Sequence, residues 1–256
     1  MNEQDDASNR SGDPTAAAGG AGSEPDAVGD HELLAAAAVR RLGHALAQAK
    51  VDPALAGRLA EVAHALADDV DLAPRRDKQA ENSRLSNRYI ALLEGRMPDP
   101  TPDGAPIEFD RFSIVGGAYS PIGLAASHHR EGDEAVTTLV FNSAYEGPPG
   151  RAHGGSVALV IDEATATVLP MVGRFGFTGS VSLRLLKPAP LDVEVQFRSK
   201  VVGEEGRKLF VHCTGIGPEG VFAEAEAVYI QVDPATVPWI AAARAARNGD
   251  RATTID

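Results

Sequence analysis

The sequence lacks the features that define several common protein classes. Its 256 residues contain one cysteine, Cys213, which excludes a disulfide framework and a cysteine-rich metal site. No run approaches the roughly 18 consecutive apolar residues needed to cross a bilayer. No basic face or aromatic RNA-binding motif stands out, which argues against a nucleic-acid partner. The N-terminal stretch MNEQDDASNR is acidic, unlike the start of a secretory signal peptide. We therefore expect a cytoplasmic protein.

Negative charge is concentrated at the start of the chain. Residues 1–30 contain seven acidic residues and one basic residue, so they hold −6 of the formal net charge of −12. This stretch has no hydrophobic periodicity and is predicted to be a disordered arm. An acidic protein can still bind an anionic ligand, because local groups rather than net charge decide binding.

Helical patterns follow in residues 31–104. Asp30 is expected to cap an alanine-rich helix, and Asp52-Pro53 is expected to open a second helix with proline at its first position. One face of the second helix has apolar residues at helical spacing: Leu55, Leu59, Val62 and Leu66. These two helices predict a helical hairpin over 31–70. A further helical run is expected around 84–95, and RMPDPTPDGAPIEF marks a linker that ends near residue 105.

From residue 105 onward the pattern changes to short strands. Two extended runs flank the turn REGD, and four more follow at 177–187, 191–202, 207–216 and 221–232, separated by KPAP, GEEG and GPEG. Strict alternation of apolar and polar residues indicates an antiparallel sheet with one solvent-exposed face. A single strongly apolar helix lies between the second and third runs, so the sheet must wrap around it. We predict an α+β domain over 105–235 and a C-terminal tail over 236–256.

The segment GPPGRAHGGSVALVIDEATATVLP, residues 147–170, contains that helix and two acids inside its apolar part. An unpaired ionised carboxylate away from water is costly, so Asp162 and Glu163 are each paired, protonated or functional. Before the helix, Gly154 and Gly155 allow close approach of a ligand to the backbone. The first amides of a helix point outward with a positive partial charge. They are therefore suited to bind a carbonyl oxygen, as an oxyanion hole does.

The spacing of these motifs resembles that of hotdog-fold acyl-CoA thioesterases. Asp162 follows His153 of HGG by nine positions, and TGSVSLRLLKPAP places Thr178 ten residues before Pro188. The start EGPPGxxHGG, the turn EGRK and the strand AEAEAVYIQVDP are similar to the phenylacetyl-CoA / 4-hydroxybenzoyl-CoA thioesterase superfamily. The resemblance spans residues 110–234 and implies a hotdog fold, in which an antiparallel sheet wraps one central helix.

The resemblance also implies a role for each motif residue. Asp162 matches the catalytic carboxylate, which acts as a general base on water or as a direct nucleophile. Thr178 matches the hydroxyl that orients the water or the carboxylate. The group His153, Gly154 and Gly155 matches the loop whose amides polarise the thioester carbonyl, and His153 either transfers a proton or caps the turn. Two subunits commonly build each site in this family, so a homodimer or a dimer of dimers is implied.

Other polar residues allow two interpretations. Arg207 and Lys208 contact CoA phosphates by the resemblance, or they are solvated charges in a turn. Glu163 is expected to face a salt-bridge partner or a dimer interface. The adjacent pair His128-His129 points to opposite faces of a strand, so the two rings cannot chelate one metal. Gly147 stands where some relatives have an asparagine, which leaves the second water-positioning group unassigned.

These observations predict hydrolysis of acyl-CoA thioesters to a free acid and CoA. One base and preorganised amides are sufficient for this reaction, so we expect no metal and no cofactor, CoA being part of the substrate. The alternative is a non-catalytic acyl-CoA-binding hotdog dimer that acts as a sensor or a structural module. An α/β-hydrolase is excluded because the sequence has no G-x-S-x-G elbow.

Overall fold

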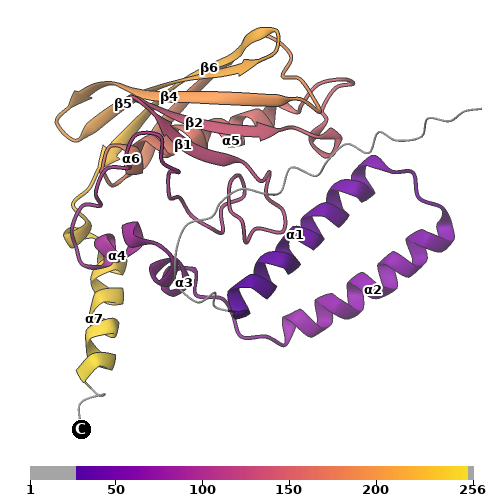
Figure 1. The fold of residues 1–256 in the computed structure, drawn as a ribbon, viewed down its shortest axis with the longest axis horizontal. Helices are drawn as coiled ribbons and strands as arrows, with labels where there is room; N and C mark the ends of the chain where they lie inside the picture. Colours follow the sequence, from indigo (N-terminus) through magenta and orange to yellow (C-terminus); the bar gives the residue numbers. More distant parts are fainter. Residues whose placement is uncertain (1–26, 253–256) are drawn as a thin grey trace, which may run out of the picture.

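A six-stranded antiparallel sheet wraps around the central helix α5 (Gly154–Ala166) in the computed structural model, which describes residues 27–252 (Figure 1). The strand order is β1-β2-β4-β5-β6-β3. The strands are β1 (Ser127–Glu131), β2 (Glu134–Val140), β3 (Gly176–Leu185), β4 (Glu194–Glu205), β5 (Lys208–Gly217) and β6 (Gly220–Gln231). The predicted order of two strands, one helix and four strands is confirmed, and so is the α+β hotdog architecture.

Alternation along the strands separates a helix-facing side from an outer side. In β6, Ala223, Ala225 and Ala227 are buried, whereas Glu224 is half-buried and Glu226 is exposed. Small residues on the inner side leave room for the side chains of α5, since the core around the helix is filled at close-packed density. The period of two therefore decides which strand residues can reach α5.

Helix α5 is apolar enough to be enclosed by the sheet. Its buried residues are Val157, Val160, Ile161, Glu163, Ala164 and Thr165. The short helix α6 (Val168–Met171), all of whose residues are buried, continues in the same direction. The 3₁₀ turn η1 (Ser143–Tyr145) and the turn at 146–153 lead from the end of β2 into the start of α5.

A long loop closes the side of α5 that the sheet leaves open. The linker first covers the outer edge of β1, where the Gly104 amide donates to the Arg130 carbonyl at 3.0 Å and the Ile107 amide donates to the His128 carbonyl at 3.0 Å. The chain then places Phe112 and Val115 in buried positions before it enters β1. Residues without regular secondary structure thus form part of the core.

Four helices precede this domain: α1 (Ala27–Gln48), α2 (Pro53–Asp71), α3 (Lys78–Leu85) and α4 (Asn87–Leu93). Asp52 caps α2 as predicted, and its carboxylate accepts from the Leu55 amide at 2.9 Å. The predicted cap at Asp30 is wrong, because α1 already begins at Ala27, so residues 27–30 are helical rather than disordered. The rest of the predicted arm, residues 1–26, lies outside the described residues. The predicted run at 84–95 is two helices, α3 and α4, because Ser86 has an extended backbone.

The α1–α2 hairpin is present, but its apolar face is largely uncovered. No residue of α2 is buried, although the structure describes the whole helix; Leu55 and Leu59 are half-buried, and Val62 and Leu66 are exposed. Helix α1 is attached to the domain through His44, whose Nε2 lies 2.9 Å from the Tyr145 hydroxyl. Hydrophobic spacing predicted the face of α2 correctly, but not what it would pack against.

The segment predicted as a tail contains a helix. After the turn η2 (Pro234–Thr236), α7 (Pro238–Ala252) projects away from the sheet (Figure 1). Its first turn is anchored by Ile240, which is buried in a cluster with Leu92 of α4 and Phe175. None of the helices within residues 27–252 combines the length and hydrophobicity needed to cross a membrane.

Candidate active site

The start of α5 presents one free backbone amide. His153 is the N-cap residue, and its Nδ1 accepts a hydrogen bond from the Gly155 amide at 2.9 Å. A substrate oxygen would have to displace this bond to use Gly155. The Gly154 amide has no hydrogen-bond partner among the described residues. Of the two predicted amides, Gly154 is therefore the one available to an incoming carbonyl oxygen, and His153 has the geometry of a cap.

An open cavity of about 390 Å³ lies beside Gly154. Its walls combine apolar side chains with two cations and include Arg151, Val157, Leu185 and Lys187. Gly154 lies so close to the end of β3 that a Cβ built on it would be 3.1 Å from Leu185 Cδ1. The sequence analysis did not single out Arg151 or Lys187, although each is a lone cation next to a proline-rich turn.

Asp162 lies two turns further along α5, on an exposed face of the helix. Its carboxylate has no side-chain or amide partner among the described residues. Partial burial raises the pKa of Asp162, and the nearby charge of Glu163 raises it further. A free carboxylate with a raised pKa is a better proton acceptor than an ordinary surface aspartate.

Glu163, the neighbouring acid, is buried and fully engaged. Its Oε1 accepts from the Gly116 amide at 2.8 Å and from the Ser113 hydroxyl at 2.9 Å, and it lies 3.0 Å from His128 Nε2. The other ring nitrogen of His128 lies 2.9 Å from the Thr137 hydroxyl. The predicted salt-bridge partner of Glu163 is thus His128. Of the two acids in the apolar part of this segment, Glu163 is therefore the one that is buried and paired.

A buried tyrosine connects the backbone at Asp162 with Thr178. The Tyr229 hydroxyl lies 2.8 Å from Thr165 Oγ1 and donates to the Asp162 carbonyl oxygen at 3.3 Å. Burial raises the pKa of Tyr229 to about 12, against opposing hydrogen bonds from Thr165 and Thr178. Thr178 is paired in register with Tyr229, so it faces α5. The sequence analysis missed Tyr229, although it continues the inward alternation of Ala225 and Ala227.

The predicted CoA-contacting cations lie in the β4–β5 turn. Arg207 and Lys208 are both exposed, and Lys208 pairs with Ile230 of β6, which in turn pairs with Phe177 of β3. They therefore lie at the same end of the sheet as Thr178, two strands away. Lys208 is on the outer side of the sheet, because its neighbour Leu209 is on the buried side. Their role in CoA binding stays a prediction.

The structure divides the predicted site into two parts. Asp162 and Thr178 lie together near the start of β3, whereas Gly154 lies near its end, beside Leu185. Eight helical residues separate Gly154 from Asp162, which is about 12 Å along the axis. Reacting groups must approach to about 3 Å. One chain alone therefore does not bring the amide and the carboxylate to the same carbonyl group.

Metal-ligating residues do not cluster in the described part of the chain. Within residues 27–252, no group of three or more His, Cys, Asp or Glu side chains is arranged to hold a metal ion. Cys213 is free and buried, and burial raises its thiol pKa to about 11. The groups that the two parts of the site offer to a substrate are thus a carboxylate, hydroxyls, a backbone amide and cations.

The sheet wrapped around α5 is the hotdog fold, and a solved structure agrees. The crystal structure of a thioesterase superfamily protein superimposes with a TM-score of 0.62 at 23% identity, covering 78% of this chain and 90% of the other. At this identity the likeness concerns the fold. No protein-family model matches the chain.

Curated relatives extend the likeness to sequence. The chain is 38% identical over 91 residues to "Acyl-coenzyme A thioesterase THEM4" of Mus musculus, which is 35% of this chain and 39% of the relative. It is 30% identical over 136 residues to THEM4 of Bos taurus, 50% of this chain and 56% of the relative. It is 33% identical over 101 residues to "Acyl-coenzyme A thioesterase THEM5" of Homo sapiens, 39% of this chain and 41% of the relative. The matches thus span between two fifths and just over half of the relatives' length.

Proposed function

We propose that this chain hydrolyses acyl-CoA thioesters to a carboxylic acid and CoA, at sites shared between the two subunits of a homodimer. The similarity to acyl-coenzyme A thioesterases supports the substrate class. The division of the site into an amide end and a carboxylate end supports the shared arrangement. The single observation on which the proposal depends is the open edge of β3, which joins those two ends.

Strand β3 is the last strand of the sheet, and within residues 27–252 it pairs only with β6. Phe177 is 49% exposed and Leu185 is 50% exposed. A ten-residue edge strand with exposed apolar side chains is a template for pairing with another chain. A second copy of β3 is a natural occupant, since a two-fold axis makes the same surface serve on both subunits.

The register of such a pair follows from the faces of the strand. Residues opposite each other in an antiparallel pair share a face, so a two-fold axis at Ser182 places Val181 of each strand opposite Leu183 of the other. The irregularity at Gly179 removes one residue from the register, because Thr178 pairs with Tyr229 and Ser180 pairs with Val228. Leu185 of one strand then lies opposite Thr178 of the other.

This pairing joins the two parts of the site. Gly154 of one subunit is adjacent to Leu185, and so comes next to Thr178 and Asp162 of the other. The Gly154 amide would polarise the thioester carbonyl, and Asp162, oriented by Thr178, would take a proton from water or attack the carbon itself. Water adds to the carbonyl carbon, the carbon–sulfur bond breaks, and the sulfur leaves as the CoA thiol. Arg151 and Lys187 would meet the phosphates of CoA at the cavity, with Arg207 and Lys208 as further candidates.

Thiol release from a panel of acyl-CoAs tests the activity. We expect the wild type to release CoA and the Asp162→Asn variant to lose most of this activity. A wild type that binds CoA but releases no thiol from any acyl-CoA would contradict the proposal and favour the non-catalytic acyl-CoA-binding dimer.

Mixing two inactive variants, Gly154→Pro and Asp162→Asn, tests whether the site is shared between subunits. Gly154→Pro removes only the free amide, because Gly154 is the first helical residue, where proline is tolerated. The preceding residue, His153, already has the extended backbone that proline requires, with φ −63° and ψ 133°. A Cβ at this position would meet only the flexible end of Leu185.

Each variant alone should be inactive, since every site lacks one group. After unfolding together and refolding, half of the dimers are mixed and each contains one complete site, so about a quarter of wild-type activity should return. If the site lay within one chain, mixing would restore nothing. A Gly154→Pro variant with full activity would instead remove the amide from the mechanism.

A further inference from the structure

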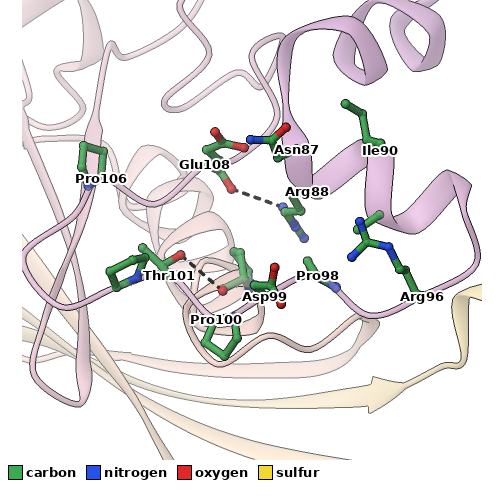
Figure 2. Close-up of a pocket in the computed structure, with 13 residues that line it drawn as sticks. Asn87, Arg88, Ile90, Arg96, Pro98, Asp99, Pro100, Thr101, Pro106 and Glu108 are labelled. Carbon is green, nitrogen blue, oxygen red and sulfur yellow. Dashed lines mark hydrogen bonds between the residues drawn. The ribbon is translucent and has the colours of Figure 1, made fainter. Parts of the chain in front are cut away.

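A second cavity, of about 420 Å³, lies between α4 and the proline-rich linker, away from the candidate active site (Figure 2). Its lining includes Asn87, Arg88 and Ile90 of α4, the linker residues 98–102, and Pro170 at α6. It shares no residue with the cavity beside Gly154, and neither Asp162 nor Thr178 lines it. Its size is within the range of small-molecule sites, about 300–1,000 Å³.

Arg88 presents a positive charge at this cavity, and the nearby carboxylates of Glu108 and Asp110 attract it without forming a direct ion pair with it. Its Nε is buried and has no hydrogen-bond partner, and its guanidinium forms no ion pair with a described residue. The one hydrogen bond that it makes is weak, from Nη1 to the Glu108 carbonyl oxygen at 3.5 Å. Buried charges in proteins are normally paired and hydrogen-bonded, because a buried guanidinium without a partner is costly. The buried Nε–H therefore lacks an acceptor, which an anion in the cavity would supply.

Two aromatic rings help to hold the Arg88 guanidinium in place. It lies 5.5 Å from the centre of the Phe109 ring and 5.8 Å from that of Tyr89. Burial lowers the pKa of Arg88, but an arginine remains protonated at physiological pH. Figure 2 shows the side chain reaching from α4 between Glu108 and the Pro98–Asp99 segment. Its planar fork is thus preorganised for a group that accepts two parallel hydrogen bonds.

The other cation at the cavity is already engaged. Arg96 forms an ion pair with Glu94, with Nε 2.8 Å from the carboxylate oxygen, and both side chains are at least half exposed. Two carboxylates, Asp99 and Glu108, also line the cavity. One unpaired cation beside two acids favours a singly charged anion over a doubly charged phosphate.

The remaining walls are apolar. Five prolines contribute to them, together with Ile90 and Ala91: Pro98, Pro100, Pro102, Pro106 and Pro170. Such walls suit the body of a ligand whose head is an anion. We propose that this cavity binds a small organic monocarboxylate, with its carboxylate on Arg88 and its apolar body against the prolines.

Direct binding measurements test this proposal independently of any thioesterase activity. Hexanoate and phenylacetate are the probes, titrated into the full chain by calorimetry and by ligand-observed NMR. Hexanamide and phenylacetamide, which have the same shape without the charge, are the matched neutral compounds, and inorganic phosphate is the alternative anion. We expect saturable binding of one acid molecule per chain, and much weaker binding of the amides and of phosphate.

Substitutions of Arg88 and of Asp99 should shift the affinity for the acid in opposite directions. Arg88→Met keeps the length of the side chain and should weaken acid binding by about tenfold or more, the value of a lost charge-assisted hydrogen bond. Arg88→Lys should recover only part of it, since an ammonium cannot form the two-pronged contact. Asp99→Asn should tighten binding a few fold by removing a repelling charge. Arg58→Met, on the exposed surface of α2, is the control and should change nothing.

The design separates a binding site from a structural role. Removing an unpaired buried charge should not destabilise the fold, so the thermal midpoint of Arg88→Met should equal or exceed that of the wild type. Equal acid affinity in Arg88→Met, or equal affinity for hexanamide, would overturn the proposal. Loss of stability in both Arg88→Met and Asp99→Asn would also overturn it, because Asp99 would then be the internal partner of Arg88. Tighter binding of phosphate than of either acid would reject the monocarboxylate class.

Discussion

Asp162 and Glu163 are neighbours in the sequence, but α5 turns them toward different surroundings. They are about 100° apart around the helix. Glu163 points into the protein, is 7% exposed and accepts from Gly116 and Ser113 while it pairs with His128. Asp162 lies on an exposed face of the helix and has no partner for its carboxylate in the described part of the chain. On one face of the helix the acid holds the loop at 107–126 to α5. On the other face the acid remains free to accept a proton.

A carboxylate in an apolar helix can thus have either of two roles, structural or chemical, and its surroundings decide which. A buried acid whose oxygen is hydrogen-bonded is held in one position and cannot accept a proton without losing those bonds. An exposed acid without such bonds is free until substrate arrives. Substitutions of the two acids therefore test each face of α5 separately.

Replacing Asp162 should abolish activity while leaving the fold intact. Asp162→Asn removes the proton acceptor, and general-base catalysis typically contributes about 10²–10⁴ in rate, so kcat for thiol release should fall by that factor. The stability at neutral pH should not decrease, because the ionised carboxylate has no partner to lose. Asp133→Asn, at the exposed β1–β2 turn, serves as the matched control and should keep wild-type kinetics. A fully active Asp162→Asn variant would assign both acids to structure.

Replacing Glu163 should have the opposite profile, with a large loss of stability. Glu163→Ala leaves the Ser113 hydroxyl, the Gly116 amide and the His128 ring without their shared acceptor. Removing one partner from a buried pair typically costs about 3–5 kcal/mol. Urea unfolding of this variant should show that loss, whereas Glu205→Ala at an exposed turn should remain within about 0.5 kcal/mol of the wild type. Wild-type stability in Glu163→Ala would mean that the pair does not hold the loop to α5.

The backbone around this pair is equally specific. A Cβ added to Gly116 would clash with His128 Nε2, and its contact with Glu163 Oε1 at 3.0 Å would be unusually tight. The pair therefore depends on a glycine that lets the loop contact it. Nothing in the periodicity of the sequence marks Gly116, because it lies in a loop with neither helical nor strand spacing.

This explains how much of the fold the sequence could predict. The strands and α5 were predictable because alternation, turn residues and a long apolar run are local signals. The loop at 107–126 covers α5 through contacts such as Val115 and Gly116, and these depend on the tertiary fold. Helix α7 was missed for the same reason, since its anchor Ile240 packs on α4, far away in the sequence.

The candidate site shows the same division. The spacing of His153, Gly154 and Asp162 was predictable from the sequence because all three lie on one helix and its cap. Which of the two acids is buried could not be predicted from the sequence, because the position of the loop at 107–126, and not the helix itself, decides it. The link through Tyr229 joins β6 to both α5 and β3, so only the strand pairing reveals it.

Thr178 should matter less than Asp162, since in the proposed mechanism it orients the reacting group and does not itself react. We expect Thr178→Ala to lower kcat by about 10- to 100-fold, because misplacing a reacting group costs rate without removing it. Tyr229→Phe should act through the same contact, so the double variant should be less impaired than the product of the two single effects. Additive effects would show that Thr178 and Tyr229 act separately, and would remove Tyr229 from the site.

The smallest expected effect is a shift in the pH dependence of activity when the charge of Glu163 is removed. Glu163→Gln keeps the shape of the side chain and an oxygen that accepts from Gly116, but it removes the negative charge that raises the pKa of Asp162. The pKa of Asp162 should therefore fall, while its rise from partial burial remains.

Kinetics as a function of pH measures this fall. Asp162 reacts as the carboxylate, so activity rises as pH passes upward through its pKa, and the acid limb of kcat/KM should move to lower pH in Glu163→Gln. Tyr229, with a pKa of about 12, stays neutral over this range and does not contribute.

The pH dependence of the free energy of unfolding measures the pKa of Asp162 independently of activity. A raised pKa means that folded Asp162 holds its proton more tightly than the unfolded chain, so stability declines as pH rises from its unfolded value, about 3.9, through the folded one. Glu163→Gln should reduce this decline, and Asp162→Asn should remove it. An acid limb that stays in place or moves to higher pH would show that the charge of Glu163 does not reach Asp162, and that the two faces of α5 are electrostatically independent.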